Sequence, residues 1–190
     1  MASTGSFFEI PDPPRFKDAR LAALYGYWHE LGEEARGLPS IQAFDALRVP
    51  RILANIWIVE VAPDSRRFRI RLAGDNINAV YGRNVGGQFF RDVFEPGDLP
   101  NIIDRYTRAL SEPSIFYATG SVYAAAGRLS SGERLGLPML GRSGLTDTLL
   151  GATCYGERIA REGSVLLTGD VAEFRPIRAA NHRAPRVQDG

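Results

Sequence analysis

The alternation of residues 67–72, RFRIRL, most strongly constrains the fold of this chain. Phe68, Ile70 and Leu72 fall on one side of an extended backbone, and the three arginines that alternate with them fall on the other. Such a period of two is typical of a strand with one buried and one solvated face. The β-branched run NIWIVEV at residues 55–61 precedes it, and the turn-forming PDS lies between them. The pattern therefore predicts an antiparallel hairpin.

Short helices and three further strands are expected after this hairpin. Helices are predicted over residues 75–81 and 99–110, because each apolar stripe ends at a glycine or a Glu-Pro pair. Strands are predicted over residues 115–125, 134–140 and 148–155, separated by the turn-rich GRLSSGE and GRSGLTD. This order of two strands, helices and three strands predicts an α+β domain.

An amphipathic helix is predicted ahead of the hairpin. Its apolar stripe has the spacing of successive helical turns and consists of Leu21, Leu24, Tyr25, Trp28 and Leu31. Such a stripe must pack either on its own domain or on the same helix of a second chain. In the second case it is the contact of a homodimer or of a partner protein.

Four regions follow from these patterns. Residues 1–15 are expected to be a flexible N-terminus, residues 16–54 leader helices, and residues 55–157 the core. Residues 158–190 are expected to be a C-terminal extension, partly flexible, with one additional strand at residues 164–167 and a loose tail from Arg178.

The composition limits the partners and the location that can be expected for this protein. The net charge of +1 gives no electrostatic reason to expect a nucleic acid or an anionic membrane as partner. The single cysteine, Cys154, excludes an internal disulfide, and the N-terminus lacks the charge and apolar pattern of a signal peptide. No apolar run approaches the roughly 20 residues that span a bilayer. A cytoplasmic protein is therefore expected.

Several segments together resemble the PAS family. The run from RFRIRLAGDNINAVYG through GRNVGGQFF is similar to the second PAS strand, the asparagine-bearing helix and the following glycine turn. GRLSSGERLGLPML and LLGATCYGE are similar to the last two PAS strands, and LYGYWHELGEEARGLPS to the leader of short, stand-alone bacterial PAS proteins. The resemblance implies a five-stranded antiparallel sheet with short helices over one face, plus the N-terminal helix.

The resemblance also implies a ligand pocket between the sheet and these helices. Its expected apolar lining is Phe68, Ile70, Leu72, Ile77, Val80, Phe90, Phe94 and Ile103. Its expected polar groups come from Asn76, Asn78, Tyr81, Tyr106 and Tyr117. The alternative interpretation is that these side chains only fill a core.

Cofactor and catalytic chemistry find little support in the sequence. Neither His29 nor His182 lies where haem would need a ligand, and the helix after the second strand has no cysteine for a flavin adduct. GRNVGG lacks the spacing of a phosphate-binding loop, no metal-ligand set is spaced for zinc, and the acids look like helix caps and turns. The cofactor is therefore unknown.

Three functions stay open from the sequence. The preferred one is a sensory or protein-interaction module, not an enzyme, that binds a small and mostly apolar ligand or none and signals through a protein partner. The second is a ligand-free dimerisation scaffold built on the leader helix. The third is a small α+β cone enzyme of the isomerase or hydratase type.

Overall fold

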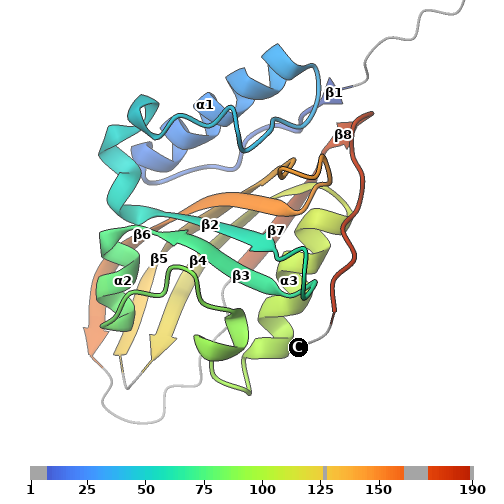
Figure 1. The fold of residues 1–190 in the computed structure, drawn as a ribbon. Helices are drawn as coiled ribbons and strands as arrows, with labels where there is room; N and C mark the ends of the chain where they lie inside the picture. The colour runs from blue at the N-terminus through green and yellow to red at the C-terminus, as the bar shows by residue number, and fades with distance from the viewer. Residues whose placement is uncertain (1–7, 126–127, 161–170, 189–190) are drawn as a thin grey trace, which may run out of the picture.

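A central antiparallel sheet with helices on both faces forms the molecule, and the computed structural model describes residues 8–125, 128–160 and 171–188. The elements are β1 (Phe8–Glu9), α1 (Ala19–Ala35), the 3₁₀ helices η1 (Ala46–Arg48) and η2 (Pro50–Asn55), β2 (Ile56–Val61), β3 (Phe68–Ala73), α2 (Asp75–Tyr81), the 3₁₀ helix η3 (Phe90–Asp92), α3 (Leu99–Ser111), β4 (Ser114–Ala125), β5 (Arg128–Met139), β6 (Thr148–Ala160), β7 (Val171–Pro176) and β8 (Arg178–Ala179). The large sheet has the strand order β3-β2-β6-β5-β4-β7 (Figure 1). The predicted α+β class is confirmed.

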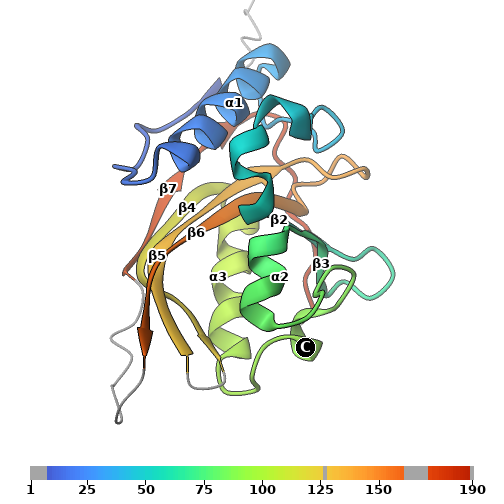
Figure 2. The ribbon, with the colours of Figure 1, turned by 90° about the vertical axis from the view of Figure 1, so that its left-hand side faces the viewer.

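The two faces of this sheet carry different layers. Helix α1 and the 3₁₀ helices η1 and η2 cover one face, which we call the leader face. Helices α2 and α3 cover the other, which we call the pocket face, and Figure 2 shows both layers with the sheet between them. Two separate clusters of buried side chains therefore form, one on each side of the sheet. None of the described helices is long and apolar enough to cross a membrane.

The sheet has six strands where the sequence predicted five. The additional strand, β7, comes from the C-terminal extension and pairs with β4 from Ser114↔Pro176 to Thr119↔Val171. It thereby satisfies backbone groups that β4 would otherwise present at the edge of the sheet. The strand predicted at residues 164–167 lies outside the described residues.

The hairpin of β2 and β3 forms as predicted, except at its last alternating residue. Ile58 pairs with Leu72 but Val59 pairs with Ile70, so Arg71 is an extra residue in β3. A bulge of one residue reverses the side to which the following side chain points. Leu72, predicted to line the pocket, is therefore 44% exposed.

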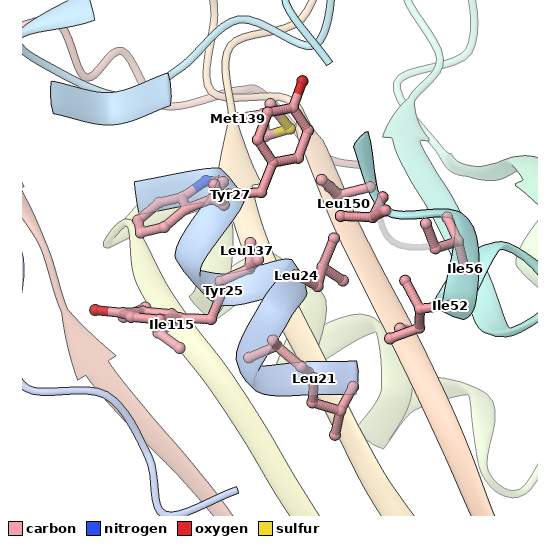
Figure 3. Close-up of a cluster of buried hydrophobic side chains, with 14 of the residues drawn as sticks. Leu21, Leu24, Tyr25, Tyr27, Ile52, Ile56, Ile115, Leu137, Met139 and Leu150 are labelled. Atoms are coloured by element: carbon pink, nitrogen blue, oxygen red, sulfur yellow. The ribbon is translucent and has the colours of Figure 1, made fainter. Parts of the chain in front are cut away.

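The apolar stripe of α1 packs on the leader face of its own sheet. Leu21, Leu24 and Trp28 are fully buried, and Figure 3 shows the helix side chains against residues of β4, β5 and β6. The Trp28 indole Nε1 donates a hydrogen bond of 3.1 Å to the Pro138 carbonyl. Tyr25 and Leu31 are also buried within the chain. Of the two packings that the sequence left open, the structure therefore has the one on the helix's own domain, and the stripe offers little surface to a second chain.

A buried carboxylate holds the beginning of α1 on the sheet. Glu133 of β5 is 7% exposed and accepts hydrogen bonds from the backbone N–H of Lys17 (2.8 Å) and of Asp18 (2.7 Å). The Tyr117 hydroxyl also donates to it. Asp18 is the N-cap residue of α1, and its carboxylate accepts from the backbone N–H of Arg20. Charge-assisted bonds of this kind fix the position of the helix.

Both ends of the described chain are bound to the rest of the molecule. β1 pairs with β8, although residues 1–15 and the tail from Arg178 were expected to lack fixed structure. The Asn181 side chain accepts from Leu38 N at 2.9 Å and donates to Leu38 O at 3.0 Å. The ring nitrogens of His182 lie within 3.0 Å of Thr146 Oγ1 and of the Ser111 carbonyl.

Candidate functional site

A small cavity lies on the pocket face, between the sheet, α2, η3 and α3. Its volume is about 30 Å³, which is room for about two water molecules. It is lined by Trp57, Val59, Ile70, Ile77, Tyr81, Phe90, Phe94, Tyr106, Arg134, Thr153 and Tyr155. Six of these eleven residues are aromatic, so a ligand here would meet ring faces and edges on most sides.

The floor of the cavity is the indole of Trp57, which lies across two glycines of the sheet. A Cβ atom added to Gly151 would lie 2.2 Å from the indole Cζ2, and one added to Gly136 would lie 3.3 Å from Cη2. These residues pair with each other in neighbouring strands, and Gly151 also pairs with Trp57. The absence of side chains at both positions therefore lets the indole rest on the sheet.

Polar atoms meet at the Nε1 edge of this indole. Trp57 Nε1 donates to Thr153 Oγ1 at 3.1 Å, and Arg134 Nε donates to the same oxygen at 3.2 Å. Thr153 is 1% exposed, whereas Arg134 is half-buried. The cavity thus has one polar end, built from residues of β2, β5 and β6.

Aromatic side chains from the helical layer form the opposite wall. The ring of Tyr106 lies 5.6 Å from that of Trp57 and stands nearly perpendicular to Phe90, at 5.1 Å and 89°. Phe94 is edge-on to Phe90 at 5.0 Å, and Tyr81 is edge-on to Phe94 at 6.2 Å. Tyr81 and Phe94 are half-buried, so this part of the wall faces the outside of the molecule.

The structure brings six of the predicted pocket residues together around the cavity. These are Ile70, Ile77, Tyr81, Phe90, Phe94 and Tyr106. Phe68 lies one layer behind, stacked on Phe90 at 5.2 Å. Ile103 and Val80 are half-buried and do not line the cavity.

The predicted polar residues lie elsewhere. Asn78 donates to the Ala73 carbonyl and accepts from Val85 N, so it stabilises the turn after α2. Tyr117 points to the leader face, where its hydroxyl donates to Glu133. Asn76 donates to Asn55 and is exposed.

Five lining residues were missed by the sequence analysis. They are Trp57, Val59, Arg134, Thr153 and Tyr155, all on strands. Gly151, Thr153 and Tyr155 alternate along the sequence and therefore lie on one side of β6, so this pattern could have predicted that they share a face. The predicted lining came instead from the second strand of the hairpin, from residues 76–106 after it and from Tyr117.

Asn55 joins the pocket face to the leader face. Its side-chain Nδ2 donates to the Thr153 carbonyl at 2.8 Å. Its Oδ1 accepts from Asn76 of α2 and from Arg20 of α1, both at 3.2 Å. Arg20 in turn forms an ion pair with Asp18 at 2.7 Å. A continuous hydrogen-bonded chain therefore runs from the wall of the cavity to the first turn of α1.

Cys154 and the histidines lie away from the cavity. Cys154 is buried among the leader-face residues, where desolvation raises the pKa of its thiol to about 12. His29 lies in α1 beside Tyr25, and His182 is hydrogen-bonded in the tail. Within the described ranges, no three His, Cys, Asp or Glu side chains gather as metal ligands.

Comparison with known proteins gives one family. A family model described as PAS domain matches residues 16–154. The match contains α1 and ten of the eleven lining residues, with Tyr155 directly after it. A search of curated proteins finds no match.

Proposed function

The chain belongs to the PAS domain family, and we propose that it is a sensory module whose cavity binds a small, mostly apolar molecule. Binding changes the packing of α1, and a partner protein reads that change. PAS domains are typically sensory or interaction modules without enzymatic activity. The proposal assigns this chain to the ligand-binding kind.

The observation that carries the proposal is an aromatic cavity with one buried polar end. Ligand sites are typically apolar hollows with a few convergent polar groups. Trp57, Thr153 and Arg134 provide those groups at one edge of the ring-lined space. Among the described residues that line it, none is acidic, so acid–base catalysis of the isomerase or hydratase type lacks a carboxylate here.

A ligand larger than two waters must displace part of the wall. The sheet side is rigid, because Trp57 rests on the backbone of β5 and β6. The helical side ends in the half-buried Tyr81 and Phe94, which can rotate outward without opening a void in the core. Binding is therefore expected to move α2 and the segment after η3.

The hydrogen bonds of Asn55 give that movement a route to α1. Displacement of α2 moves Asn76, which donates to the same Asn55 oxygen as Arg20 does. A ligand shifts the position of α1 only as far as it favours one arrangement over the other. The buried stripe of α1 gives no support to a ligand-free scaffold that dimerises through this helix.

Native mass spectrometry of the purified protein, compared with its denatured mass, tests the proposal. Extra mass that disappears on denaturation is expected. Ile77→Phe should fill the cavity and abolish the extra mass, whereas the matched change Leu47→Phe, at a side chain 80% exposed, should retain it. A bare wild-type protein that also fails to bind small aromatic compounds would contradict the proposal.

A further inference from the structure

We propose that the ligand is an uncharged, single-ring aromatic compound whose carbonyl oxygen accepts a hydrogen bond from the Thr153 hydroxyl. This inference rests on the proposed function and specifies its ligand class. It follows from the hydrogen bonds of Thr153, from the burial of this side chain and from the arrangement of the aromatic rings.

The Thr153 hydroxyl is a buried donor at the polar end of the cavity. Its oxygen accepts from Trp57 Nε1 at 3.1 Å and from Arg134 Nε at 3.2 Å. An indole N–H and a guanidinium N–H can only donate, so these contacts occupy both lone pairs of the oxygen and leave its proton unused. Within the described residues, no protein atom accepts that proton. Thr153 therefore offers a ligand one donor and no acceptor.

The position of this donor is fixed by the sheet. Thr153 is 1% exposed, lines the cavity and lies directly opposite Arg134 in the pairing of β5 with β6. A buried donor without a partner is costly, so a ligand oxygen placed beside it relieves that cost. The backbone carbonyl of the same residue accepts from Asn55 at 2.8 Å. The ligand oxygen would thus bind at the start of the hydrogen-bonded chain that leads to α1.

A single hydroxyl donor suits a carbonyl oxygen better than a carboxylate. An ionised carboxylate has about four acceptor positions, and one uncharged donor leaves most of them without a partner. A charge without such partners is costly to bury. Arg134 makes a further interaction besides its bond to Thr153, so none of its donors is assigned to the ligand. A carbonyl oxygen has two lone pairs and no charge, and one hydrogen bond satisfies much of its demand.

The walls favour a flat ring. The Trp57 indole rests on the sheet, and the rings of Tyr106 and Phe90 form the opposite wall. A ring inserted there meets one aromatic face and several aromatic edges, which are the preferred arrangements of ring pairs. A benzene-sized cavity is about 150 Å³, against about 30 Å³ here. Outward rotation of the half-buried Phe94 vacates the space of one ring, which limits the ligand to a single ring.

Infrared spectroscopy of bound acetophenone tests the contact on wild-type protein. Acetophenone has one aromatic ring and one carbonyl group, and isotope labels in that group separate its stretching band from the bands of the protein backbone. A hydrogen bond to the oxygen weakens the C=O bond. We therefore expect the band of the bound compound at lower frequency than in acetonitrile, a polar solvent without hydrogen-bond donors.

Two variants at one position locate the donor. α-Methylstyrene has the shape of acetophenone with a CH₂ group in place of the oxygen, and an NMR titration of the Trp57 indole N–H gives the affinity of each compound. The ratio of the two affinities should shift about fivefold against acetophenone in Thr153→Val, as the loss of one hydrogen bond predicts. Thr153→Ser, the matched change that retains a hydroxyl, should keep the wild-type ratio. The infrared measurement needs no variant, so it decides the contact even if Thr153→Val fails to fold.

Two further compounds test the shape and the charge on wild-type protein. Cyclohexyl methyl ketone has the carbonyl group without the flat ring, and benzoate has the ring with a charged group. We expect each to bind at least about fivefold more weakly than acetophenone, because one loses the contacts between rings and the other must bury a charge.

Each contrary result overturns a definite statement. A carbonyl band that does not shift, or an unchanged affinity ratio in folded Thr153→Val, overturns the contact to Thr153. Cyclohexyl methyl ketone that binds as tightly as acetophenone overturns the flat ring, and benzoate that does so overturns the absence of charge. Binding of none of the probes overturns the inference as a whole. If native mass spectrometry then shows a different bound compound, the proposed function stands, and if it shows bare protein, both fall.

Discussion

Replacement of Glu133 by glutamine tests the attachment of α1 to the sheet. The Lys17 N–H donates to one carboxylate oxygen and the Asp18 N–H to the other. An amide offers one oxygen, so in Glu133→Gln one backbone N–H must face an NH₂ group. A hydrogen bond to a charged group contributes about 1.5 to 3 kcal/mol, and a buried donor left unpaired costs a similar amount. We therefore expect a loss of about 2 to 3 kcal/mol of unfolding free energy.

Urea unfolding followed by circular dichroism measures this loss, and thermal unfolding should show a Tm lower by about 5 to 10 °C. The matched control is Glu173→Gln on β7, because Glu173 is 42% exposed and pairs with Arg175 at 3.3 Å. Such surface pairs contribute about 0 to 1 kcal/mol. A Glu133→Gln protein as stable as this control would refute the reasoning, since the carboxylate would then not be holding the helix.

Three further outcomes are expected. The hydrogen bond from Arg20 lowers the pKa of Asp18 to about 2 from 3.8. The stability that ionised Asp18 adds is therefore complete above the higher pKa and is lost as the pH falls through the lower one. The difference in unfolding free energy between wild type and Asp18→Asn, measured in urea, should become smaller from pH 5 to pH 2, and a constant difference would contradict this. Burial raises the pKa of Cys154 to about 12, so iodoacetamide at pH 8 should label this thiol only in urea, and rapid labelling of native protein would contradict its burial. Gly151→Ala should cost about 1 to 3 kcal/mol by overpacking and shift the tryptophan fluorescence, whereas Gly97→Ala, which has open space, should do neither.

Local patterns predicted most of the secondary structure. The alternation of residues 67–72 and the breakers around residues 141–147 predicted β3 and the beginning of β6, since strand and turn preferences act over a few residues. They could not predict the exposure of Leu72. The bulge at Arg71 depends on pairing with Ile58 and Val59 of another strand, which the local sequence does not encode.

The sequence also could not predict which segments pack against each buried surface. The spacing of Leu21, Leu24 and Trp28 indicates a buried face, but the same spacing fits a dimer and an intrachain contact. The floor of the cavity needs Trp57 on β2 and Gly151 and Gly136 on two further strands. Only the strand order brings these residues together, and that order is not a local property.

Occupation of the cavity is proposed to change the packing of α1. Amide hydrogen exchange of residues 19–35, with and without the compound that co-purifies, measures this change. We expect altered exchange at the beginning of α1 in wild type. A much smaller effect is expected in Asn76→Ala, which lacks the contact to Asn55 but retains the cavity lining. Wild-type exchange that stays unchanged while the compound is bound would show that the cavity does not act on α1.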